Sequence, residues 1–188
     1  MALKNLILSS TDDLTSLLLK KNISRWNDLL EFVKNIPYGR NSNRTDFSLV
    51  ITENKGTCSS KHAFLKEIAI LNDIENVTLV LAIYRMNAVN TPKIKDILYK
   101  YKLEYIPEAH CYLKIDNEVI DCTFSNSNFN TISNDILKEI DIQPKDVCFF
   151  KVDYHKNFLK NWIKSHFIKY SFEEIWEIRE ECIKNLES

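Results

Sequence analysis

The chain has 188 residues, with 25 Lys and Arg against 26 Asp and Glu, and 45% of its residues are hydrophobic. This balance is typical of a globular protein and argues against intrinsic disorder. The formal net charge of −1 provides no excess of basic residues, so we expect neither nucleic acid nor an anionic membrane as a partner. Only two residues, Gly39 and Gly56, are glycine, which excludes the glycine-rich phosphate loops of Rossmann and P-loop proteins.

The amino end contains one short apolar run. This run is far shorter than the ~7–15-residue core of a signal peptide or the ~20 residues of a membrane span. We therefore expect a cytoplasmic protein. The five cysteines are odd in number and lack paired short spacings, which predicts free thiols rather than a disulfide scaffold or a zinc ribbon.

Two helices are predicted near the start of the chain. Over 10–20, serine and threonine precede leucines at helical spacing, and over 24–35 an apolar stripe follows one helix face until Pro37. A polar, irregular connection covers 38–55, and long ordered loops often contribute to function. The residues from Cys58 onward then predict a largely buried helix.

The middle of the chain changes to extended structure. A β-branched run at 77–86 predicts a buried strand, and a helix is expected from Thr91, with proline in its first position. Two alternating segments, 109–115 and 118–124, predict an antiparallel hairpin.

The last third of the chain is predicted to be mainly helical. Its expected elements are a short helix near 133–140, a strand at 147–152, and helices at about 154–169 and 172–186. Ser171 and Glu174 are spaced as a capping box at the start of the last helix. The sequence contains no internal repeat.

Cys58 carries the clearest chemical signal. In the first turn of a helix, unpaired N–H groups and the positive end of the dipole favour a thiolate. A thiolate nucleophile also needs an imidazole to take its proton and a third group to orient that imidazole, and His110 and Asp121 can supply these roles. For a hairpin that turns at Asp116 and Asn117, these two residues fall within one pair of perfect register, which permits a hydrogen bond on one face. Their neighbours point to the opposite face, where we expect them to pack as small hydrophobes: Cys111 and Cys122.

Three segments carry this pattern: GTCSSKHAFL at 56–65, EAHCYLKI at 108–115 and VIDCTF at 119–124. Together they resemble the transglutaminase-like superfamily, whose members share a papain-like core and a Cys, His, Asp triad in that order. The resemblance covers roughly residues 40–125. It implies that Cys58 is the nucleophile, His110 the general base and acid, and Asp121 the orienting carboxylate. The separation of His and Asp is short, and Ile120 stands where the superfamily often has Trp.

A tetrahedral intermediate also needs donors for its oxyanion. The resemblance implies the backbone N–H of Cys58 and a second donor from upstream. The polar connection offers three candidates for that second donor: Asn41, Asn43 and Arg44. These side chains are equally suited to forming turns and surface contacts.

A zinc site is the main chemical alternative. Cys58 and His62 are four residues apart on the predicted helix, so they share a face that His110 could complete as a third ligand. A fourth ligand at a usual spacing is missing from the sequence, so we favour the triad and interpret His62 as a supporting or core imidazole. Lys61 is interpreted as a solvated charge rather than a helper of the thiolate.

The carboxyl-terminal helices contribute no predicted site. His155 and His166 lie among lysines, which is typical of a solvated helix face. Four aromatic residues near the junction of the last two helices are interpreted as core, with a surface for a partner as the alternative: Trp162, Phe167, Phe172 and Trp176.

The sequence thus predicts an α+β fold in which a central helix carrying Cys58 packs on an antiparallel sheet, and the resemblance implies that its core is papain-like and transglutaminase-like. We expect a single domain over 1–188, with a core at about 38–152 and helical additions at 1–37 and 153–188. The resemblance implies thiol-dependent acyl transfer on a peptide or small-molecule amide, hydrolysis by default, and no metal or organic cofactor. The alternative is a catalytically inactive binding module of the same superfamily. The natural substrate and the oligomeric state are not encoded in any motif.

Overall fold

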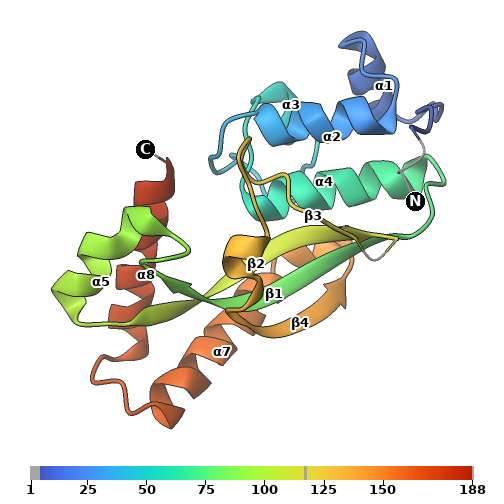
Figure 1. Cartoon of the computed structure of the whole chain (residues 1–188). Helices are drawn as coiled ribbons and strands as arrows, with labels where there is room; N and C mark the ends of the chain where they lie inside the picture. Colours follow the sequence, from blue (N-terminus) through green and yellow to red (C-terminus); the bar gives the residue numbers. More distant parts are fainter. Residues whose placement is uncertain (1–4, 117, 188) are drawn as a thin grey trace. The chain divides into compact units, whose positions relative to one another are not determined.

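The computed structural model describes residues 5–116 and 118–187 (Figure 1). Within them it has an α+β fold with eight α-helices and a four-stranded antiparallel sheet of order β3-β2-β1-β4. The strands are β1 (Val77–Asn87), β2 (Tyr105–Ile115), β3 (Glu118–Ile120) and β4 (Ile136–Ile142). The general fold class predicted from the sequence is therefore confirmed. No helix in the described residues has the length and apolar character needed to cross a bilayer.

The chain divides into two compact units. The first comprises Met1–Leu81, Cys111–Phe129 and Ile140–Cys148, and the second comprises Ala82–His110, Asn130–Glu139 and Phe149–Ser188. Strands β1, β2 and β4 each contribute residues to both units.

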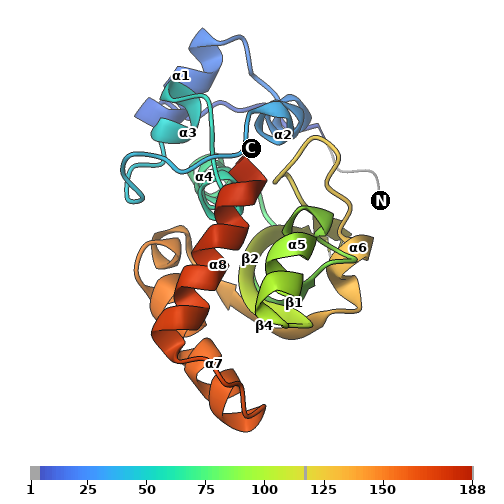
Figure 2. The same cartoon turned by 90° about the vertical axis from the view of Figure 1, so that its left-hand side faces the viewer.

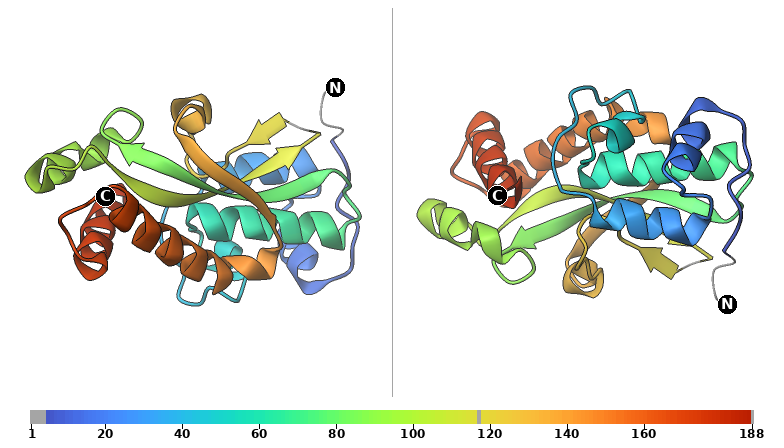
Figure 3. Two further views of the ribbon diagram at one scale, coloured as in Figure 1. Left: turned by 90° about the horizontal axis from the view of Figure 1, so that it is seen from below. Right: turned by 90° about the horizontal axis from the view of Figure 1, so that it is seen from above.

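The first unit is built around a buried helix. Its helices are α1 (Asp13–Lys20), α2 (Trp26–Asn35), α3 (Leu49–Thr52) and α4 (Cys58–Leu71). Helices α2 and α4 lie side by side (Figure 3). The apolar stripe of α2 is fully buried at Trp26, Leu29 and Val33, which confirms the helix and the core face that its spacing predicts.

Helix α4 begins where the sequence indicates. Thr57 is its N-cap: the Thr57 hydroxyl accepts the N–H of Ser60, and the Ser60 hydroxyl accepts the N–H of Thr57. This reciprocal capping box satisfies two backbone donors and fixes Cys58 as the first helical residue. Apolar and polar side chains alike are buried along α4, as expected for a helix covered on several sides.

The hairpin has the predicted register but a shorter second strand. Leu113 faces Ile120 and Ile115 faces Glu118, as required by a turn at Asp116 and Asn117, although Asn117 itself lies outside the described residues. The expected strand over 118–124 ends at Ile120. The chain leaves the ladder there because Asp121 accepts the N–H of Thr123 in a local turn, which competes with further pairing.

Two predictions between residues 130 and 152 are wrong. The expected helix near 133–140 is a short helix, α6 (Asn130–Ser133), followed by strand β4. The expected strand at 147–152 is a 3₁₀ helix, Pro144–Val147, followed by the start of α7 (Phe150–Ser165). ILKEIDI alternates charged and apolar residues from Glu139 onward, which is a strand pattern. Pro144 instead favours the first turn of a helix.

The second unit contains three longer helical elements. The predicted helix after Thr91 is a 3₁₀ turn, Pro92–Ile94, continuing into α5 (Lys95–Tyr101). Helix α8 (Phe172–Glu187) packs against both α5 and α7 (Figure 2). The Ser171 hydroxyl accepts the N–H of Glu174, and the Glu174 carboxylate accepts the N–H of Ser171, so the predicted capping box is confirmed.

A buried ion pair lies inside the second unit. Glu108 on β2 accepts two hydrogen bonds from Arg179 on α8, and the pKa of Glu108 falls to about 2 because the Arg179 guanidinium and His155 outweigh the opposing effect of burial. His155 is buried and donates to the carbonyl of Pro107 at 2.8 Å. The prediction that His155 lies on a solvated face is therefore wrong, whereas His166 is exposed as expected.

The aromatic residues near the α7–α8 junction do not form one core. Trp162 is buried, and its indole N–H donates to the Tyr105 hydroxyl. Phe172 and Trp176 are half-buried. Phe167 is 91% exposed, in a left-handed backbone conformation with φ 51°, so its assignment to the core is wrong: it lies in the turn that follows α7 rather than on a helix face.

Candidate functional site

Cys58 occupies the first position of α4, as its sequence predicts. Its side chain is only 7% exposed, and Sγ lies 3.8 Å from the hydroxyl oxygen of Ser59. The capping box uses the N–H of Ser60 and not that of Cys58. A thiol at this position lies at the positive end of the helix dipole.

His62 links Cys58 to the segment after β3. One turn along α4, its Nδ1 donates to the carbonyl oxygen of Cys58 at 2.7 Å, and its Nε2 accepts the N–H of Cys122 at 2.8 Å. A nitrogen that accepts an N–H carries no proton, so His62 is a neutral imidazole protonated on Nδ1. With both nitrogens engaged, His62 is a supporting core imidazole and is not available to zinc.

Asp121 lies beside this imidazole in the first unit. Its Oδ1 accepts the N–H of Thr123 at 2.9 Å and is 3.8 Å from Nε2 of His62. Because that nitrogen accepts the N–H of Cys122, the contact is not an ion pair. The structure therefore holds the Asp121 turn against the same helical turn that begins with Cys58.

His110 belongs to the second unit, whereas Cys58 and Asp121 belong to the first. It lies on β2 and is half-buried, and its ring meets the ring of Tyr84 on β1 edge-on, with 6.0 Å between centroids. The observed ladder ends at Ile120. His110 and Asp121 are thus not partners in the described ladder; continuation of the same register would set Asp121 opposite Tyr112, two residues further along β2.

The cysteines that neighbour the predicted triad are structural. Cys111 and Cys122 are both buried, as expected for small hydrophobes. Burial raises the pKa of Cys122 to about 12, and its thiol donates to the carbonyl of Leu30. All five cysteines, Cys58 among them, are free thiols, as the sequence predicts.

The prediction that Lys61 is a solvated charge is wrong. It is fully buried, and its ammonium donates to the carbonyl oxygens of Ile36 at 2.7 Å and Thr123 at 2.8 Å. Burial lowers its pKa to about 8, against the opposing effect of Cys122, Asp121 and Cys58. The signal was its spacing: Lys61 lies on the same helical stripe as Leu65 and Ile68, both fully buried.

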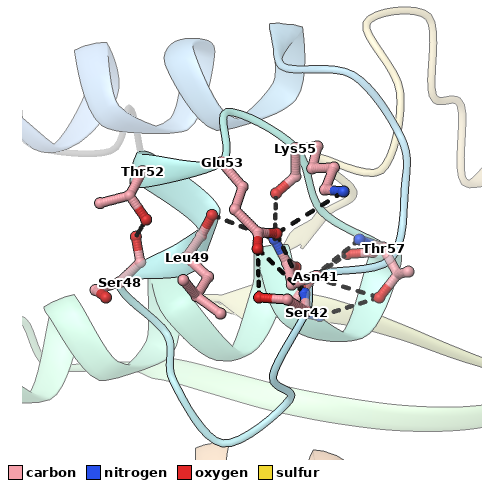
Figure 4. A network of polar contacts seen from close by, with 9 residues as sticks. Asn41, Ser42, Ser48, Leu49, Thr52, Glu53, Lys55 and Thr57 are labelled. Atoms are coloured by element: carbon pink, nitrogen blue, oxygen red, sulfur yellow. Dashed lines mark hydrogen bonds and ion pairs between the residues drawn. The ribbon is translucent and has the colours of Figure 1, made fainter.

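The candidates for a second oxyanion donor are used elsewhere. Asn41 donates its amide to the carbonyl oxygens of Leu49 and Lys55 and to the Glu53 carboxylate (Figure 4). Asn43 accepts the N–H and hydroxyl of Thr45 in an exposed local turn. These side chains therefore hold the connection before α4, as the turn-forming interpretation predicts.

The third candidate, Arg44, contributes its backbone to the same connection. Its carbonyl oxygen accepts the thiol of Cys148 at 3.3 Å. Nearby, the Glu53 carboxylate accepts the N–H and hydroxyl of Ser42, which lower the pKa of that carboxyl (Figure 4). Several polar residues of 38–55 thus form hydrogen bonds within the loop and hold its conformation.

The chain leading into Cys58 is also fixed. The N–H of Gly56 donates to the carbonyl of Pro37, and the N–H of Gly39 donates to the carbonyl of Gly56. The Tyr38 ring stacks on that of Phe124, with centroids 5.0 Å apart. Residues just before Cys58 and just after Asp121 are therefore tied to one another within the first unit.

Metal binding finds no support in this arrangement. Across residues 5–116 and 118–187, no three or more His, Cys, Asp or Glu side chains are grouped to hold a metal ion.

Comparison with protein family models, curated proteins and solved structures found no match to the chain.

Proposed function

We propose that this chain is a thiol-dependent acyl-transfer enzyme of papain-like type, with Cys58 as nucleophile, His110 as general base and acid, and Asp121 as the orienting carboxylate. The observation that supports it most is the junction made by His62, which ties the Cys58 turn to the segment bearing Asp121. A nucleophile at a capped helix start and a carboxylate held beside the same turn are two of the three parts that such a mechanism needs.

The reaction proceeds in two halves. His110 takes the proton of the Cys58 thiol, and the thiolate sulfur forms a bond to the carbonyl carbon of an amide. The tetrahedral intermediate collapses as the C–N bond breaks, and His110 returns the proton to the departing amine. Water then attacks the thioester, giving the carboxylic acid and the free thiol. The proposed substrate is a peptide or a small-molecule amide, and the proposed default is hydrolysis rather than transfer to a second amine.

A binding module without catalysis is the second candidate. It is favoured by the commitment of the Asn41 amide donor to the loop and by the low exposure of Cys58. In that case the thiol of Cys58 would behave like that of any other buried cysteine.

Alkylation kinetics distinguish the two candidates. Native protein is treated with iodoacetamide across pH ~5–9, and each cysteine is followed by mass spectrometry of its peptide. Cys148, 9% exposed against 7% for Cys58, is the matched reference thiol. The enzyme hypothesis predicts that Cys58 reacts roughly a hundredfold faster than Cys148 and loses this advantage in His110→Ala. Equal rates at Cys58 and Cys148 contradict it and favour the binding module.

A further inference from the structure

The buried ammonium of Lys61 joins three segments of the first unit. Its helix, α4, begins three residues earlier at Cys58. Its two hydrogen bonds reach Ile36, the C-cap of α2, and Thr123, which follows Asp121 in the turn after β3. The side chain thus connects the Cys58 turn directly to the Asp121 turn.

A charged group is an expensive choice for this position. Burying an ammonium costs free energy that two carbonyl dipoles only partly offset. A methionine would fill the same elongated space without that cost. The charge is therefore not explained by packing, and its position between the turn that begins at Cys58 and the turn that bears Asp121 indicates an electrostatic role.

The charged groups that act on the Lys61 ammonium are acidic and favour its protonated form. The Asp121 carboxylate and a thiolate at Cys58 favour its protonated form, whereas the Cys122 thiol, with its pKa raised to about 12, is neutral at neutral pH. His62, the other polar side chain buried in the same helical turn, is neutral in its observed hydrogen bonds. Lys61 thus provides a buried positive charge for the Asp121 carboxylate and for a thiolate at Cys58.

We infer that Lys61 is a positioning residue for the acyl-transfer site: it anchors the Asp121 turn to the Cys58 end of α4, and its buried ammonium places a positive charge where these two segments meet. The inference rests on the proposed function for its catalytic consequence. Its anchoring part is independent of that function, because it concerns only the backbone of the turn.

Hydrogen exchange tests the anchor. In Lys61→Met, exchange at the N–H groups of Cys122 and Thr123, which bond His62 and Asp121, is expected to rise roughly tenfold. Lys66→Met is the matched control, since Lys66 also lies on α4 and donates to a backbone carbonyl, that of Val77 at 2.7 Å. It should leave that peptide unchanged. Lys61→Gln, which keeps a donor but no charge, serves if Lys61→Met does not fold.

Alkylation tests the electrostatic part. In Lys61→Gln and Lys61→Met, Cys58 is expected to react roughly tenfold more slowly with iodoacetamide at neutral pH, and its rate should rise at a higher pH than in the wild-type chain. Lys66→Met should match the wild-type profile. A pH shift separates this role from a structural one, because loosened packing would expose the thiol and speed its reaction at every pH.

Failure of the proposed function and failure of the Lys61 inference give different experimental results. If wild-type Cys58 reacts no faster than Cys148, the proposed function fails, and the exchange experiment alone decides the anchor. If wild-type Cys58 is fast and the Lys61 variants keep its rate and pH profile, the inference is overturned even where exchange increases. Unchanged exchange in folded Lys61→Met overturns the anchor.

Discussion

The Cβ atom that Gly56 lacks would lie 2.8 Å from Cγ of Lys61 and 3.0 Å from the Ser60 hydroxyl oxygen. The glycine therefore makes room for the buried lysine stem at the start of α4. Gly56 matters because the Lys61 side chain approaches its backbone so closely that a Cβ atom would clash. Lys61 is fixed at its far end by two hydrogen bonds, so its stem has little freedom to move aside.

Gly56→Ala is expected to destabilise the chain by about 1–3 kcal/mol, because the new methyl overpacks a filled interior. Gly39→Ala is the matched control: its Cβ would meet Cδ of Lys55 at 3.4 Å, an ordinary contact. Urea unfolding of both variants measures the difference. Equal stabilities would show that the Lys61 stem relaxes without cost.

Removal of the proposed triad residues should separate activity from stability. We expect Cys58→Ala to abolish amide hydrolysis while leaving the unfolding free energy nearly unchanged, and His110→Ala to lower kcat/KM by roughly 10²–10⁴. Asp121→Ala should cost somewhat less. Amine release from a panel of amides provides the measurement, and full turnover in any variant removes that residue from the triad.

Arg179→Met should destabilise the second unit by about 3–5 kcal/mol, because it leaves the Glu108 carboxylate buried without its partner. Lys100→Met, on α5, removes only an exposed ion pair to Glu181, which lies on α8 like Arg179, and is expected to leave stability nearly unchanged. Both are compared by denaturant titration. A cost for Arg179→Met no larger than that of the control would mean that Glu108 finds another partner or becomes neutral.

Acid should weaken the fold through Glu108. Its pKa in the folded chain, about 2, lies below the 4.5 of the unfolded group, so its stabilisation is complete above pH 4.5 and is lost as the pH falls towards 2. Unfolding free energies measured between these pH values should fall more steeply for the wild-type chain than for Glu108→Gln. Parallel curves would rule out Glu108 as the source.

Asn41→Leu should loosen the loop before α4, since two carbonyls and the Glu53 carboxylate lose a shared donor. We expect a cost of about 1–3 kcal/mol and faster proteolysis within 38–55. Asn43→Ala removes only an exposed turn contact and should behave like the wild-type chain. Limited proteolysis read by mass spectrometry checks this, and identical cleavage of both variants would contradict it.

Local patterns predicted most of the helices. The stripe containing Trp26 and Leu29 and the polar residues before Cys58 specify α2 and α4 because propensity, capping and burial agree there. Strand β4 was missed because its alternation is short and its first residues, Ile136 and Leu137, are both apolar. Such a strand is defined by its partner in the sheet rather than by its own residues.

In the candidate site, too, some features follow from local sequence patterns and others do not. The helical position of Cys58 and the supporting role of His62 follow from sequence spacing, and so does the hairpin register. The hydrogen bonds of Lys61 do not, because the two carbonyls that accept its protons, those of Ile36 and Thr123, lie 25 and 62 residues away along the chain. Long-range backbone acceptors leave no trace in the side-chain pattern.

Because Lys61 is fully buried, the rate at which its amine is acylated reports how often the first unit opens. Amine-reactive acylating reagents modify exposed lysines at once, but they reach the Lys61 amine, which has 0% exposure, only when the surrounding structure opens transiently. The slow appearance of acylated Lys61, set against the immediate labelling of surface lysines in the same digest, would report the frequency of that opening without any substitution in the chain.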